Sequence, residues 1–161
     1  MKKCSFLRFF SHLENFNQSQ PYLLPLIEVF VFGQFFFKDF PLLGLIFLPL
    51  LPLLTIYSGI PYAGMIIFFA LWLLVVRNEK ISHFIRFNTM QAIILDIVIF
   101  LCRILTDVVQ FVPGSGFVMQ TLYTTIFMGI VAAVVYAVVQ SLMGKYAEIP
   151  AISDAVYMQV R

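Results

Sequence analysis

Long apolar runs separated by short polar breaks dominate the pattern along this chain. Four runs approach or exceed the roughly 20 residues that a helix needs to cross the hydrocarbon core of a bilayer. They cover residues 40–57, 61–76, 87–109 and 117–143. Pro49 and Pro52 predict a kink in the first run, and the length of the last predicts a tilt in the membrane. The pattern therefore predicts an all-α integral membrane protein with four transmembrane helices over residues 40–143.

The N-terminal part of the chain departs from this pattern. In MKKCSFLRFFSHLENF, basic residues are interleaved with phenylalanine and leucine, which is typical of an amphipathic helix lying in the membrane interface. Residues 22–37 are apolar, but Pro25, Glu28 and Gly33 interrupt them, which favours an interfacial or re-entrant segment over a fifth span. The chain thus divides into an N-terminal part, a four-helix part and a C-terminal tail, over residues 1–39, 40–143 and 144–161.

Composition supports a membrane protein and excludes other classes. Of the 161 residues, 61% are hydrophobic and 11% are charged, against about 25% charged in an ordinary soluble domain. A soluble core of this length cannot hide so much apolar surface, so lipid must surround much of the chain. The net charge is +2 and no basic run indicates nucleic-acid binding. Cys4 and Cys102 lie far apart and no metal-ligand spacing occurs, so we expect neither metal nor cofactor.

The basic residues predict an orientation. With four spans over residues 40–143, nine of the ten lysines and arginines fall on one side of the membrane, and Arg103 is the exception. By the positive-inside rule, that side faces the compartment from which the protein is inserted, and it holds both termini and the 77–86 loop. A fifth span would destroy this partition. The nine residues are Lys2, Lys3, Arg8, Lys38, Arg77, Lys80, Arg86, Lys145 and Arg161.

One face of the third predicted span is polar. A helix turns by about 100° per residue, so positions seven apart nearly superpose. Thr89, Asp96, Arg103 and Gln110 are each seven apart, and Asp107 lies close to the same face. Because a charged side chain at mid-bilayer costs at least about 2.5–3.5 kcal/mol, this face should point at protein or water. Arg103 and Asp107 can pair on the helix surface, whereas Asp96 needs a partner on another helix, a water or a proton.

The fourth predicted span offers a counterpart to this polar stripe. Thr121 and Thr125 lie near its start and can hydrogen-bond across a tight turn to the end of the third span, which predicts a hairpin of the two helices. Gly129, Ala133 and Ala137 recur at four-residue spacing. Small residues at that spacing allow a neighbouring helix to approach closely, so we interpret them as packing positions.

A second group of candidates lies in the 77–86 loop and at the head of the third span. These residues could form a docking surface for a partner subunit or contact lipid headgroups. In the simpler interpretation, Asn88 caps the helix and Arg86 holds a lipid phosphate. The group comprises Arg77, Lys80, Arg86, Asn88 and Gln91.

Three blocks, in this order along the chain, resemble the twenty-kilodalton Tic family. They are IPYAGMIIFFALWLLVVRN (60–78), RFNTMQAIILDI (86–97) and GKYAEIPAISDAV (144–156). The resemblance implies a membrane-embedded core subunit of the protein-import translocon of the chloroplast inner envelope, with both termini in the stroma. For a cyanobacterial relative the membrane would be the plasma membrane. Other translocon subunits, precursor polypeptides in transit and membrane lipids are the implied partners, in a hetero-oligomeric complex.

Three functions stay open on this basis. In the first, the polar stripe lines a conduit for polypeptides in a translocon channel. In the second, the chain is a noncatalytic scaffold or assembly subunit, and the stripe is a seam that holds helices together. The third is a small-solute or ion carrier, although no internal repeat is visible. We expect no enzyme, because the sequence contains no HExxH, GxSxG or P-loop motif and no cysteine–histidine pairing.

Overall fold

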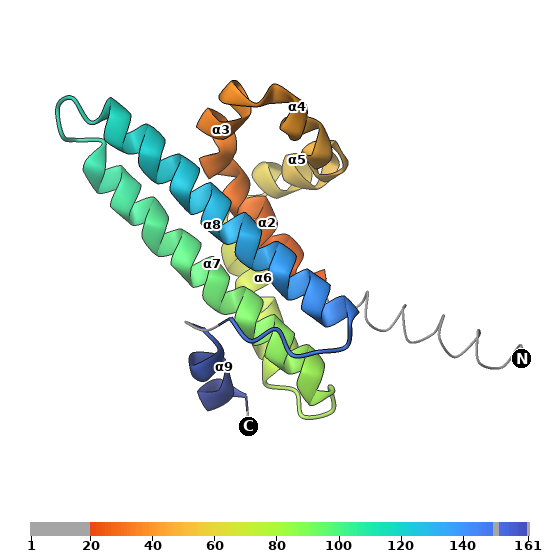
Figure 1. Ribbon diagram of the computed structural model, residues 1–161. Coiled ribbons are helices and arrows are strands. Elements are labelled where there is room, and N and C mark those ends of the chain that lie inside the picture. The colour runs from red at the N-terminus through yellow and green to blue at the C-terminus, as the bar shows by residue number, and fades with distance from the viewer. Residues whose placement is uncertain (1–19, 150–151, 161) are drawn as a thin grey trace, which may run out of the picture.

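The computed structural model describes residues 20–149 and 152–160, and this part of the chain is helical, without strands. Helices α7 (His83–Val109) and α8 (Gly116–Leu142) form a long antiparallel hairpin (Figure 1). Each has 27 residues, which corresponds to about 40 Å. The turn between them contains Pro113, which has no backbone N–H, and Gly114 at a φ of 80°. The predicted hairpin of the helices over residues 87–109 and 117–143 is confirmed, although α7 is not among the helices that by length and composition could cross a bilayer.

A continuous helical run over Gln20–Asp39 packs against both long helices. It consists of η1 (Gln20–Tyr22), α2 (Leu23–Val29), η2 (Phe30–Gly33) and α3 (Gln34–Asp39). Tyr22 contacts the head of α7, whereas the ring of Phe36 lies 5.3 Å from that of Phe127 in α8. The run is therefore parallel to α7 and antiparallel to α8.

Residues 22–37, where we expected an interfacial or re-entrant segment, lie within this helical run, which by length and composition could cross a bilayer. Pro25 falls in the first turn of α2, where its missing N–H removes no helical hydrogen bond. Glu28 turns toward the neighbouring helices and is buried. The expected amphipathic helix at the very N-terminus lies outside the described residues.

Residues 41–76 form a series of short helices that leads back to the head of α7. Helices α4 (Pro41–Gly44), η3 (Leu45–Leu50) and α5 (Leu51–Gly59) make an exposed arc, and α6 (Ala63–Leu71) continues into the π-helical turn η4 (Trp72–Val76) beside α7 (Figure 1). Pro49 lies inside η3, in agreement with the predicted kink. Between α5 and α6, Ile60 is extended because Pro61 follows it, and Tyr62 is left-handed, with a φ of 60°. This break ends one helix and starts the next beside α2.

The prediction of four spans is not confirmed. By length and composition, three helical runs of the described chain could cross a bilayer, and the run over Ala63–Val76 is shorter. Those three are Gln20–Asp39, Pro41–Gly59 and Gly116–Leu142. Helix α3 lies toward the opposite end of the bundle from the head of α7 (Figure 1). The grouping of nine basic residues on one side of the membrane stays a prediction.

The apolar core lies where α2, α7 and α8 meet. It contains fully buried side chains from these helices and from the adjoining η2, including Val29, Phe32, Ile99 and Phe127. The C-terminal helix α9 (Ser153–Gln159) folds back against the head of α7. The described chain therefore begins and ends at the same end of the bundle (Figure 1). Many large hydrophobic side chains on the outside are exposed, as expected of a surface in contact with lipid.

Candidate functional site

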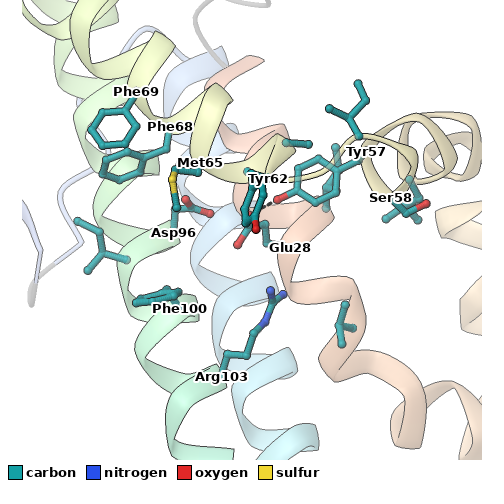
Figure 2. Close-up of a pocket in the computed structure, with 17 residues that line it drawn as sticks. Glu28, Tyr57, Ser58, Tyr62, Met65, Phe68, Phe69, Asp96, Phe100 and Arg103 are labelled. Atoms are coloured by element: carbon teal, nitrogen blue, oxygen red, sulfur yellow. Dashed lines mark hydrogen bonds between the residues drawn. The ribbon is translucent and has the colours of Figure 1, made fainter. Parts of the chain in front are cut away.

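A cavity of about 640 Å³ lies on the side of the bundle between α2, α5, α6 and α7. Two carboxylates from helices far apart in the sequence face it, Glu28 from α2 and Asp96 from α7 (Figure 2). Both side chains are deeply buried, with 9% and 7% of their surface exposed. We call this site the carboxylate cavity. Its polar lining also includes Tyr57 and Arg103.

The helix break at residues 60–62 brings two more groups to this cavity. The hydroxyl of Tyr57, near the end of α5, donates a hydrogen bond to Oε1 of Glu28. Gly64, near the start of α6, lies against the same pair, and a Cβ atom there would collide with the Tyr57 hydroxyl and the Glu28 carboxylate. Glycine at this position therefore allows α6 to approach α2 closely.

Asp96 is not fully hydrogen-bonded. Its Oδ1 is buried and has no hydrogen-bond partner among the described residues. The charged groups close enough to act on it are Glu28 and Arg103. The neighbouring group on another helix is a second carboxylate, Glu28, within side-chain hydrogen-bonding reach of Asp96. The guanidinium of Arg103, an exposed residue of α7, points toward the two acids (Figure 2).

The predicted polar stripe of α7 divides into three parts. Thr89 is fully buried, and its hydroxyl has no hydrogen-bond partner in the described chain. Asp96 and Arg103 line the cavity. Asp107 and Gln110 are exposed near the end of α7 and do not line it.

The predicted positions of α8 lie apart from the cavity. Thr121 and Thr125 are exposed, and the Thr121 hydroxyl donates to the carbonyl oxygen of Phe117 in its own helix, at 2.9 Å. Gly129 is exposed, with open space where a Cβ would lie, whereas Ala133 is half-buried and Ala137 is fully buried. Only the end of this small-residue row toward Ala137 is covered by neighbouring segments.

Asn88 and Gln91 belong to a second group of polar side chains, in which Asn88 Nδ2 is buried and has no hydrogen-bond partner among the described residues. The hydroxyl of Tyr22 donates to Gln91 Oε1 at 3.0 Å and approaches Asn88 Oδ1 at 3.4 Å. Gln91 Nε2 donates to the carbonyl oxygen of Ala147 at 2.6 Å. We call Tyr22, Asn88, Gln91 and this carbonyl the tail cluster, because it fixes the C-terminal tail to the head of α7. The N-cap of α7 is Ser82, so the prediction that Asn88 caps the helix is wrong.

The other predicted docking residues lie around the loop. Arg77 and Lys80 are exposed, and the Arg77 guanidinium lies 5.6 Å from the centre of the Trp72 ring. Arg86 is half-buried, and its Nε donates to the carbonyl oxygen of Val76 at 2.7 Å. Arg77 and Lys80 are thus on the surface, whereas Asn88 and Gln91 are fully buried and belong to the fold.

Aromatic contacts add to the attachment of the tail. The Tyr146 ring lies 4.9 Å from Phe84 and 5.0 Å from Phe87, and its hydroxyl lies 3.2 Å from His83 Nδ1. The second and third sequence blocks quoted above, at residues 86–97 and 144–156, therefore contact each other. Their shared role in this structure is to attach the tail.

Sequence reasoning missed Glu28, Tyr57 and Gly64 as site residues. Glu28 carried a signal, because it is the one acidic residue in the apolar stretch 22–37. Nothing in the sequence marked Tyr57 or Gly64 as site residues, because only the helix break at residues 60–62 places them beside Glu28. Among the described residues, no three histidine, cysteine, aspartate or glutamate side chains gather as metal ligands.

The fold and the cavity define a class, that of all-helical membrane proteins with ionisable side chains inside a helix bundle. The family model described as "Chloroplast import apparatus Tic20-like" matches residues 18–156. This chain belongs to the Tic20 family, and the family resemblance of the sequence is confirmed.

Relatives from cyanobacteria, plants and red algae share most of the chain. A Tic20 family protein of Synechocystis sp. is 49% identical over 149 residues, which cover 92% of this chain and 93% of the relative. Protein TIC 20-II, chloroplastic, of Arabidopsis thaliana is 39% identical, with 86% and 68% covered. The Tic20 family protein Ycf60 of Porphyra purpurea is 34% identical, with 87% and 72% covered.

Proposed function

We propose that this chain is a noncatalytic, membrane-embedded subunit of a protein translocon and that the carboxylate cavity borders the route of the polypeptide. Family membership supports a component of the chloroplast import apparatus. The proposed location is the chloroplast inner envelope, with both termini in the stroma, or the plasma membrane if the chain is cyanobacterial. Other translocon subunits and precursor polypeptides are the proposed partners.

One observation carries the channel part of this proposal. Two buried acids face a cavity on the side of the bundle, although burying an ionisable group in a membrane protein is costly. A seam that only held helices together would be expected to pair its ionisable groups, because an unpaired buried carboxylate costs far more than an unpaired neutral amide such as Asn88 Nδ2 in the tail cluster. Asp96 Oδ1 instead has no partner among the described residues. An unpaired carboxylate oxygen of this kind is expected on a surface that binds different polypeptide segments in turn.

The rim of the cavity suits a variable polypeptide. Its large side chains are Tyr62, Met65, Phe68, Phe69 and Phe100. Aromatic and methionine side chains can contact many different apolar partners without specific hydrogen bonds. The cavity belongs to one small chain and lies on its side, so a complete conduit requires further subunits or copies.

Site-specific photocrosslinking tests the proposal. Phe100 lines the cavity and is 58% exposed, whereas Leu101 is equally exposed, at 58%, but does not line it. A photoreactive residue at Phe100 should crosslink to a precursor arrested in mid-import in chloroplasts that carry this chain. The same residue at Leu101 should crosslink to lipid or membrane subunits instead. Ala92, on the predicted polar face, is fully buried and cannot report on the route.

The scaffold function is the second candidate, and the exposed loop residues favour it. Arg77 and Lys80 are exposed in the loop that leads into the head of α7, and the described chain starts and ends at that end of the bundle (Figure 1). If both probes crosslink only to membrane subunits, and Arg77→Ala with Lys80→Ala releases those subunits, the chain is a scaffold and the channel proposal fails.

A further inference from the structure

The carboxylate cavity holds more acidic than basic side chains. It brings two buried carboxylates together, and among the residues that line it Arg103 is the one basic residue; its guanidinium points toward the acids from an exposed position, so a single positive charge faces two carboxylates. Acids that lie close together in an apolar setting require compensating positive charge or a shared proton. An additional cation would satisfy both acids.

The hydrogen bonds of the two acids indicate where that cation binds. Glu28 accepts a hydrogen bond from Tyr57, which holds one of its oxygens in place. Asp96 is more than nine-tenths buried, and its Oδ1 is unpartnered within the described chain and belongs to a side chain that lines the cavity. Figure 2 shows both side chains pointing to the same space. A donor placed between them would bond to Asp96 without breaking the bond from Tyr57.

We infer that the carboxylate cavity binds the basic side chain, lysine or arginine, of an apolar polypeptide segment. This inference rests on the proposed function, and it names the kind of segment that the site accepts. The planar guanidinium of arginine offers several donors in one plane, which suits two carboxylates better than the ammonium group of lysine does.

The cavity wall fits the rest of such a side chain. Phe68, Phe69 and Phe100 offer aromatic faces, which attract a cation and cover the methylene stem of lysine or arginine. A volume of about 640 Å³ is in the range of small-molecule sites and exceeds the need of a bare ion. A hard metal ion would need six or more oxygen ligands, and the described residues show no three-ligand cluster.

A binding assay on the purified full chain tests the inference apart from transport. The chain is placed in nanodiscs of neutral lipid, because anionic lipid alone attracts basic peptides. The probe is a short, fluorescent amphipathic peptide with a single arginine, and the reference is the same peptide with citrulline, which keeps the shape but lacks the charge. Removing one partner of a buried charge pair weakens binding at least about thirtyfold, so the citrulline peptide should bind that much more weakly.

Matched variants locate the effect. Asp96→Asn and Glu28→Gln keep the side-chain size and should each remove most of the preference for arginine over citrulline. Asp107→Asn removes an exposed acid from the same helix outside the cavity and should leave the preference unchanged. The two peptides on the unmodified chain still decide the question if a variant fails to fold.

Equal binding of the two peptides overturns the inference, as does an equal loss in Asp107→Asn and Asp96→Asn, because either result means nonspecific attraction. The outcomes also separate this inference from the proposed function. If Phe100 crosslinks to a precursor but arginine is not preferred, only the charge recognition is wrong. If arginine is preferred but no precursor crosslinks form, the cavity binds peptides and the translocation role is wrong.

Discussion

Two groups of polar side chains lie inside this bundle, and they differ in charge and in the space beside them, although each holds one buried atom without a partner in the described chain, Asn88 Nδ2 in the first and Asp96 Oδ1 in the second. In the tail cluster, neutral groups from three segments meet, and Gln91 both accepts from Tyr22 and donates to Ala147. In the carboxylate cavity, ionisable groups from two helices meet beside open space, and Asp96 keeps an unpartnered oxygen within the described chain. The first arrangement fixes the fold, whereas the second leaves room for an occupant.

The difference shows that burial alone does not separate a structural polar group from a functional one. Gln91 is fully buried and Asp96 is nearly so. A neutral amide can satisfy both its donor and its acceptor inside the fold, and it then stabilises the segments that it joins. A buried carboxylate beside another carboxylate gains no such stability. Substitutions at the two sites should therefore act in opposite ways on stability and on function.

The largest effect on stability is expected in the tail cluster. Gln91→Leu leaves the Ala147 carbonyl without its donor and the Tyr22 hydroxyl without its better acceptor, which should lower the free energy of unfolding by about 2–4 kcal/mol. Thermal unfolding followed by circular dichroism measures the change, and limited proteolysis reports release of the tail. Gln110→Leu, at an exposed glutamine at the end of α7, is the control and should change little. Equal losses in the two variants would contradict a special role for Gln91.

A smaller effect is expected from adding one methyl group beside the cavity. In Gly64→Ala the new Cβ meets the Tyr57 hydroxyl and the Glu28 carboxylate, so α6 must shift and the protein should lose about 1–3 kcal/mol. Gly129→Ala meets open space in the middle of α8 and should gain roughly 0.5–1 kcal/mol. Opposite shifts of the melting temperature are the expected result. Stabilisation by both substitutions would mean that α6 does not pack closely against Glu28.

The smallest effect on stability is expected at Asp96. Asp96→Asn removes a buried charge whose Oδ1 has no partner among the described residues, so the free energy of unfolding should stay within about 0.5 kcal/mol or rise slightly. Crosslinking of the precursor from the Phe100 position should nevertheless fall. A stability loss as large as that of Gln91→Leu would instead place Asp96 in a structural seam and favour the scaffold function.

The sequence by itself determined the features that depend on local order. Long apolar runs become helices wherever they lie, so the all-helical membrane character followed from composition and run length. The hairpin of α7 and α8 was predicted from a tight turn between two long apolar runs, although the Thr121 hydroxyl donates within α8 rather than to the end of α7. Helical periodicity placed Asp96 and Arg103 on one face, and both line the cavity.

Only the tertiary structure decided which polar residues are covered and by what. Periodicity groups Thr89 with Gln110, yet one is fully buried near the head of α7 and the other is exposed at its end. Glu28 and Pro25 read locally as interruptions, but packing against α7 turns Glu28 into the partner acid of Asp96. The break at residues 60–62 then adds Tyr57. A sequence pattern determines on which face of its own helix a side chain lies. Which other helix covers that face depends on contacts between segments that are far apart in the sequence.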